Sequence, residues 1–95
     1  MTEIHTKTKT SFYRRIYLAY LIESGCNTPK AIVEATEMPR RTLQDTIKAL
    51  SDLEIVCQAQ GGTKAMHYTI ESWGPIDKSW IQANLADIKD VLQYP

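Results

Sequence analysis

The sequence predicts a mainly helical α+β fold with a three-helix core, a two-stranded β-hairpin and an additional C-terminal helix in 95 residues. Three observations predict it. Apolar side chains recur at helical spacing through residues 10–50. Two runs of β-forming residues then flank Gly61 and Gly62. Apolar residues at intervals of four and three return in residues 77–93.

Composition and charge limit the function. No run approaches the roughly 20 apolar residues that span a bilayer, and the N-terminus lacks the apolar segment of a signal peptide. We therefore expect a cytoplasmic protein without a membrane partner. The net charge is zero, but residues 1–50 carry eight basic and five acidic side chains, and residues 51–95 carry three and six. This asymmetry predicts a basic half that faces DNA and an acidic half that faces away.

The N-terminal part should form an arm and a helix. Residues 1–9 are polar, which predicts a flexible arm. A helix should follow over residues 10–24 and end before Gly25. Leu18 and Ile22 lie away from its main apolar side, so the helix is apolar nearly all round. Such a helix must be covered on more than one face, by the C-terminal helix, a partner chain, or both.

Two short helices joined by a tight corner are predicted over residues 28–50. The first begins with Thr28, which can cap it, and Pro29, which suits a first helical turn. The second covers residues 39–50. Its inward face carries Leu43, Ile47 and Leu50. Its outward face carries Arg40, Arg41, Thr42, Gln44, Asp45 and Lys48. This layout is that of a helix-turn-helix, whose second helix enters the DNA major groove.

A β-hairpin is predicted directly after these helices. Residues 53–60 and 63–70 favour strands, and the paired glycines between them supply the positive φ of a tight turn. One face should pack inward through Ile55, Cys57, Met66, Tyr68 and Ile70. A helix-turn-helix followed by a two-stranded hairpin is a winged helix, and the tip of this wing offers only Thr63 and Lys64 for contacts with phosphates.

A last helix should run from Asp77, as N-cap, to about Gln93. It carries an apolar seam of two heptads, which is too short for a stable coiled coil alone. Joined to the second apolar side of the first helix, this seam forms a candidate dimer interface. The interface comprises Leu18, Ile22, Trp80, Ile81, Leu85, Ile88 and Leu92. In the alternative, the helix folds back onto its own domain.

Residues 12–70 resemble the winged-helix domains of small bacterial transcription regulators, such as the multiple-antibiotic-resistance and arsenic-repressor types. The resemblance rests on ATEMPRRTLQDTIKALSDLEIV, with its polar, arginine-bearing second helix, and on AMHYTI, which is similar to a returning wing strand. Together with the polar N-terminus and the apolar seam of the last helix, it predicts three parts: a flexible N-terminal arm (1–9), a winged helix-turn-helix domain (10–72) and a C-terminal helix expected to mediate dimerisation (73–95). Two residues depart from the pattern. Glu37 stands where the corner often has glycine, and Asp45 is a carboxylate on the DNA-facing side, where it can pair with Arg41 or accept from a cytosine amino group.

Other kinds of site find little support. No phosphate loop, metalloprotease motif or nucleophile motif is present, so we predict neither an enzyme nor a cofactor. Cys57 and His67 could be cross-strand neighbours, but two ligands do not make a zinc site, and we predict no metal. Cys26 could be a redox-responsive thiol, although a small half-buried side chain is the simpler interpretation.

The combined prediction is a sequence-specific DNA-binding transcriptional repressor that acts as a homodimer on double-stranded DNA. The residues expected to contact DNA are Arg40, Arg41, Thr42, Gln44, Lys48, Lys30, Lys64 and Thr63. The alternative is a winged-helix module that binds another protein, as a co-regulator or anti-repressor, without contacting DNA. The zero net charge and the acidic C-terminal half favour that alternative.

Overall fold

The computed structural model describes residues 6–62 and 65–95. Within them the elements, in chain order, are α1 (Lys7–Glu23), α2 (Pro29–Thr36), α3 (Arg40–Ala49), the 3-10 helix η1 (Leu50–Leu53), β1 (Val56–Gln60), β2 (His67–Ser72), α4 (Lys78–Ala83) and α5 (Leu85–Leu92). The predicted mainly helical α+β class, with a three-helix core and a two-stranded hairpin, is confirmed. No helix of the described residues is long and apolar enough to cross a membrane.

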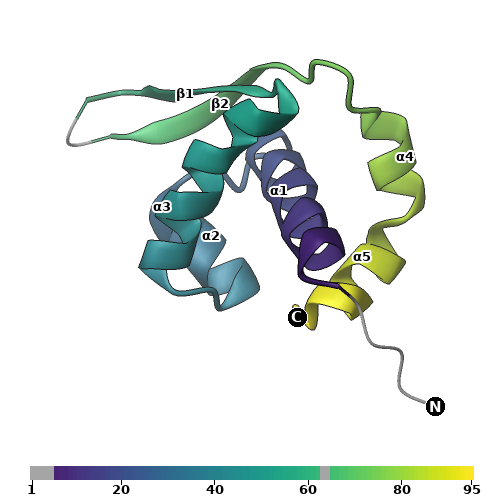
Figure 1. Ribbon diagram of the computed structural model, residues 1–95. Coiled ribbons are helices and arrows are strands. Elements are labelled where there is room, and N and C mark those ends of the chain that lie inside the picture. Colours follow the sequence, from purple (N-terminus) through teal and green to yellow (C-terminus); the bar gives the residue numbers. More distant parts are fainter. Residues whose placement is uncertain (1–5, 63–64) are drawn as a thin grey trace.

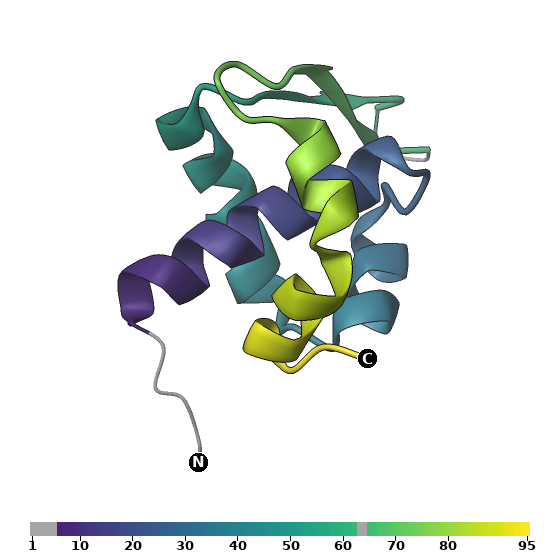
Figure 2. The same cartoon turned by 90° about the vertical axis from the view of Figure 1, so that its right-hand side faces the viewer.

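Helix α1 lies at the centre of the molecule, with α2 and α3 on one side, α4 and α5 on the other, and the hairpin across one end (Figures 1 and 2). On the first side, Leu18 and Ile22 pack in a cluster with α2 and α3. On the other, Ile16 and Tyr17 pack against α4 and α5. The expectation that this helix is covered on more than one face is therefore confirmed.

The start of α1 differs from the prediction. The hydroxyl of Thr6 accepts a hydrogen bond from the backbone N–H of Lys9 at 3.1 Å, so the helix begins at Lys7 instead of residue 10 or 11. Residues 7–9, which were expected in a flexible arm, are thus the first turn of α1. Residues 1–5 lie outside the described residues.

The two predicted helices of the helix-turn-helix are confirmed. Thr28 Oγ1 accepts from the backbone N–H of Ala31 at 3.1 Å and caps α2. At the corner, Glu37 adopts a left-handed conformation with φ of 61°. Thr36 Oγ1 accepts from the N–H of Met38 at 3.2 Å, and the Met38 side chain is only 4% exposed. Burial of Met38 holds the corner in place although Glu37 is not a glycine.

The hairpin is antiparallel, with Cys57 opposite Ile70 and Gln60 opposite His67. Cys57 and His67 are therefore not cross-strand neighbours, which removes the pair considered for a metal site. The backbone N–H of Tyr68 donates to the carbonyl of Asn27 at 2.8 Å and joins the hairpin to the loop before α2. The predicted inward face is confirmed, since Ile55, Tyr68 and their neighbours on that face are buried or half-buried.

Both strands begin later than predicted. Residues 50–53 continue α3 as the 3-10 helix η1, so β1 begins only at Val56. Gly61, at the wing tip, has φ of 86°, and a Cβ there would lie 2.1 Å from the carbonyl oxygen of Ala65. Only glycine fits that turn. Thr63 and Lys64, the wing residues expected to contact DNA, lie outside the described residues.

The C-terminal segment forms two helices instead of the single helix expected over residues 77–93. Asn84 ends α4 with its side-chain amide donating to the carbonyl of Trp80 at 2.7 Å, and α5 begins at the next residue. Asp77 caps α4 as predicted, with its carboxylate accepting from the N–H of Ser79 at 2.9 Å. The break at Asn84 lets Ile81 of α4 and Ile88 of α5 both pack against α1.

This packing buries, within one chain, most of the side chains expected at a dimer interface. Five of its side chains, Leu18, Ile22, Ile81, Ile88 and Leu92, are at most 9% exposed inside one chain. Leu18 and Ile22 pack in the cluster with α2 and α3, and Ile81, Ile88 and Leu92 pack in the cluster with Ile16 and Tyr17, so these side chains are buried within one chain. Trp80, which is 44% exposed, and the half-buried Leu85 are the expected interface residues that stay accessible.

The beginning of α4 is also tied to the end of α1. The indole N–H of Trp73 donates to one carboxylate oxygen of Glu23. The ammonium of Lys78 lies 3.2 Å from the other oxygen. Exposed ion pairs contribute little to stability, roughly 0–1 kcal/mol, so the buried apolar contacts account for most of the attachment. The C-terminal helices are thus part of the same packed unit as the helix-turn-helix.

Candidate nucleic-acid interface

Helix α3 has one buried side and a charged, exposed one. Leu43 and Thr46 are buried. On the opposite side, Arg41, Asp45 and Lys48 follow one another at steps of four and three residues and are all exposed. We call these three residues the α3 ridge. Of the other residues expected to contact DNA, Arg40, Gln44 and Lys30 are exposed and Thr42 is half-buried.

A polar hollow of about 280 Å³ lies on one side of the ridge, between α1 and α3. It is lined by Ser11, Arg14, Arg15, Thr42, Asp45, Thr46 and Ala49, and we call it the α1-side hollow. Arg14 and Arg15 were not among the predicted contact residues. Their sequence position could have indicated this. They lie one turn before Leu18, on the side of α1 that packs on α3, so their side chains extend beside α3.

A second hollow, of about 610 Å³, lies on the other side of α3 and reaches the wing. It is lined by Thr28, Pro29, Lys30, Arg40, Ala65, Met66 and His67, and we call it the wing-side hollow. It brings together Lys30 and Arg40, which were predicted from two different helices, and adds His67 from β2. The Nδ1 atom of His67 lies 3.0 Å from the carbonyl oxygen of Ala65. Because a carbonyl oxygen can only accept, Nδ1 is the donor in this hydrogen bond.

The charges of the two hollows differ. The wing-side hollow has basic residues and no acidic one, whereas the α1-side hollow holds two arginines and Asp45. Arg41 and Asp45, considered as a pair from their spacing, form no ion pair within 4.0 Å. The other arginines and lysines of α2 and α3 form no ion pair with any described residue either. The ion pair found within the described ranges joins Lys78 and Glu23. Among the residues that the structure describes, these arginines and lysines therefore have no acidic partner.

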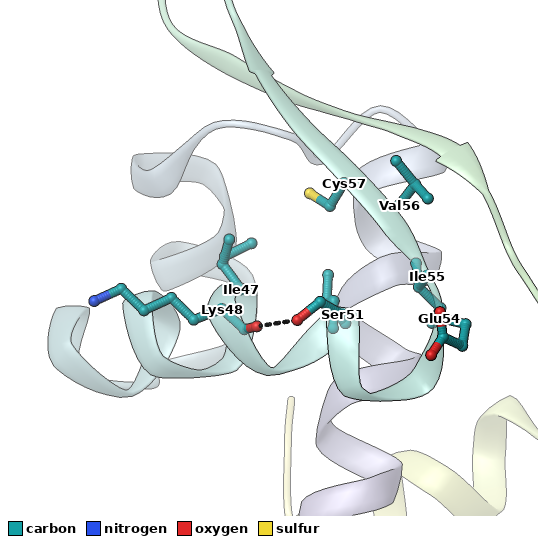
Figure 3. A pocket seen from close by; sticks show the side chains of 8 residues that line it. Ile47, Lys48, Ser51, Glu54, Ile55, Val56 and Cys57 are labelled. Carbon is teal, nitrogen blue, oxygen red and sulfur yellow. Dashed lines mark hydrogen bonds between the residues drawn. The ribbon is translucent and has the colours of Figure 1, made fainter.

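A third hollow lies behind the C-terminal end of α3 and differs in character (Figure 3). Its volume is about 410 Å³, and its lining is Ile47, Lys48, Leu50, Ser51, Glu54, Ile55, Val56 and Cys57. Ser51 Oγ donates to the carbonyl of Lys48 at 3.1 Å, which uses the hydroxyl within the chain. Figure 3 shows Cys57 on the side of β1 that faces Ile47, and Val56 on the opposite side.

Neither cysteine has the environment of a reactive thiol. Burial raises the pKa of the Cys57 thiol. Burial, and to a smaller extent the charge of Glu34, raises the pKa of the Cys26 thiol. A higher pKa lowers the fraction of thiolate, which is the form that binds metals and is oxidised. Both cysteines are free, and no group of three or more histidine, cysteine or acidic residues that could hold a metal ion occurs in residues 6–62 and 65–95.

The order of elements, the exposed α3 ridge and the hairpin define a helix-turn-helix protein with a wing. Residues 7–92 match the family model described as winged helix-turn helix, and the chain belongs to this family. The match includes α4 and α5, so the C-terminal helices lie within the family unit and not beyond it.

A solved structure of a DUF2131 family protein from Shewanella amazonensis is similar to this chain over nearly its whole length. The two are 33% identical, the match covers 96% of this chain and 91% of the other, and the TM-score is 0.90. No curated protein matches the chain. The comparisons thus establish the family over residues 7–92.

Proposed function

We propose that the protein is a sequence-specific DNA-binding transcriptional regulator that reads the major groove with α3. One observation carries the proposal: the exposed α3 ridge has arginine-lined or lysine-lined hollows on both sides. A helix in the major groove lies between two phosphate backbones about 12 Å apart. Basic side chains on both flanks of the helix can contact both backbones, whereas the ridge itself reaches the base edges.

The proposed contacts follow from these positions. Arg41 and Gln44 contact bases, and Arg40 contacts either a base or a phosphate at the wing-side hollow. Lys30 and Lys48 contact phosphates. Arg14 and Arg15, together with Thr42, contact the backbone on the side of α1. The wing residues Thr63 and Lys64 remain proposed phosphate contacts.

The regulator is proposed to be a small bacterial, cytoplasmic repressor that binds as a homodimer. Support for a dimer comes from Trp80, which is 44% exposed although it is a large apolar side chain. Its ring contacts Tyr13 edge-on, with ring centroids 6.3 Å apart, so α1 and α4 share one aromatic surface. A dimer of helix-turn-helix domains binds two half-sites about 10–10.5 base pairs apart.

The test is DNA binding by the full chain at several salt concentrations. We expect wild-type protein to bind genomic fragments with affinity that falls steeply with salt, because bound arginines and lysines release counterions. The double variant R40A/R41A should bind at least about tenfold more weakly, since each lost base or phosphate contact is worth on the order of 1 kcal/mol or more. The matched control K78A/K89A removes two positive charges from α4 and α5 and should bind like wild type.

The alternative function is binding of another protein through the same winged helix. Its specific support is the exposed Trp80 together with the zero net charge of the chain. The salt series separates the two functions. Absence of DNA binding even at low salt supports the protein-binding module, and a steep salt dependence supports the DNA-binding regulator.

A further inference from the structure

Asp45 occupies an unusual place for an acidic residue. It lies in the middle of the α3 ridge, one turn after Arg41 and one turn before Lys48, and it is exposed. Arg14 and Arg15 line the same hollow, yet Asp45 forms no ion pair within 4.0 Å with any residue of the described ranges. No side-chain hydrogen bond within those ranges uses its carboxylate either. Within the described residues its acceptor oxygens thus have no partner, and they can accept from an external donor.

The chemistry of that donor is restricted. An ionised carboxylate only accepts hydrogen bonds, and it is repelled by phosphates. In the major groove the base edges offer two kinds of donor, the N4 amino group of cytosine and the N6 amino group of adenine. Beside N6, adenine also presents the acceptor N7, which repels the second oxygen of a carboxylate. Cytosine has no such acceptor next to N4, so it is the better partner.

From this placement we propose that Asp45 is a specificity-determining residue that selects a cytosine by accepting from its N4 amino group. The inference rests on the proposed DNA-binding function and deepens it. Arg41 precedes Asp45 by four residues, or about 6 Å along the helix axis, which corresponds to about two base-pair steps of 3.4 Å. Arg41 pairs best with guanine O6 and N7. The preferred half-site therefore holds a guanine and a cytosine within about two base pairs of each other.

The experiment is selection of bound sequences from a random DNA library by the full-length wild-type chain and by D45N, D45A and D52N. Asp52 is an exposed acid in η1, beyond the C-terminal end of α3, so D52N makes the same change of charge at a control position. Asparagine can bond both N6 and N7 of adenine. We expect D45N to replace cytosine by adenine at one position, D45A to lose the preference there, and D52N to select the wild-type sequence.

Competition binding then measures the size of the effect. Wild-type protein should prefer the cytosine-bearing site over the same site with adenine by about 5- to 150-fold, the range for one base contact. D45N should lose or reverse this ratio. Because Asp45 is exposed, the variants should melt within a few degrees of wild type, which circular dichroism can verify.

Two results overturn the inference, and they are distinguishable. If D45N and D45A bind DNA more tightly but select the wild-type sequence, Asp45 acts only as a repelling charge and the DNA-binding function stands. If the wild-type chain enriches no sequence and binds DNA at no salt concentration, the proposed function itself fails and this inference fails with it.

Discussion

Substitution of Arg14 and Arg15 tests whether the α1-side hollow contacts the phosphate backbone of DNA. Both are half-buried, and both line the α1-side hollow beside Thr42. If each contacts one phosphate, the double variant R14A/R15A loses two contacts. Each contact contributes about 0.9 to the slope of log affinity against log salt, so the slope should become shallower by about 1.8.

That change has a measurable size. Between 50 and 200 mM salt, a slope difference of about 1.8 means that R14A/R15A loses about 12-fold less affinity than wild type over the same range. Fluorescence anisotropy with a labelled duplex, at four salt concentrations, gives both slopes. The variant should weaken binding to all sequences alike, because phosphate contacts carry no sequence information.

The matched control is again K78A/K89A, which removes the same charge from the other side of α1 and should keep the wild-type slope. A wild-type slope for R14A/R15A, alongside a reduced slope for R40A/R41A, would refute the assignment of the α1-side hollow to the backbone. Melting curves must accompany the titrations, because the half-buried stems of these arginines also pack between the helices.

Two further predictions concern the fold. Glu37 has φ of 61° and an exposed side chain. Because only glycine relieves the left-handed strain, E37G should be more stable than E37A by about 1 kcal/mol, or roughly 4–8 °C in melting temperature. Equal melting temperatures would contradict strain at the corner. Ile88 is 0% exposed inside one chain, so I88A should lower the free energy of unfolding by about 2–5 kcal/mol. D87A, an exposed neighbour, should change the free energy of unfolding by about 0.5 kcal/mol or less. If the difference in the free energy of unfolding between I88A and wild type disappeared when both proteins were diluted, Ile88 would pack between two chains instead.

The helix-turn-helix and the wing could be predicted from the sequence because their signals are local. Thr28 and Pro29 begin α2, Leu43 and Leu50 repeat at helical spacing in and after α3, and the glycine pair requires a tight turn. Each signal involves residues close together in the chain. The unusual conformation of Glu37 was also predictable, because the position of the corner follows from the two helices that it joins.

The C-terminal half could be predicted only in part. The apolar spacing of residues 81–92 predicts a buried face but not what covers it, and a dimer and a fold-back helix bury the same residues. The outcome depends on α1, whose two apolar sides need two covers within one chain. The break at Asn84 has the same origin. It depends on how two short helices fit along α1, and asparagine there carries no strong local signal for a break.

The packing of the C-terminal helices changes what a dimer of this protein requires. With Ile81, Ile88 and Leu92 buried in one chain, a second copy must bind to surface that α4 and α1 leave exposed, such as the aromatic pair of Tyr13 and Trp80. A stable interface buries about 1,200–2,000 Å² in total, far more than two aromatic rings provide, so any dimer must extend over neighbouring parts of α1 and α5. The spacing of half-sites in selected DNA therefore reports on this surface as well. Paired sites about 10 base pairs apart need a dimer whose α3 ridges lie one turn of DNA apart, whereas single sites mean that one chain, with its basic hollows on both flanks of α3, is sufficient.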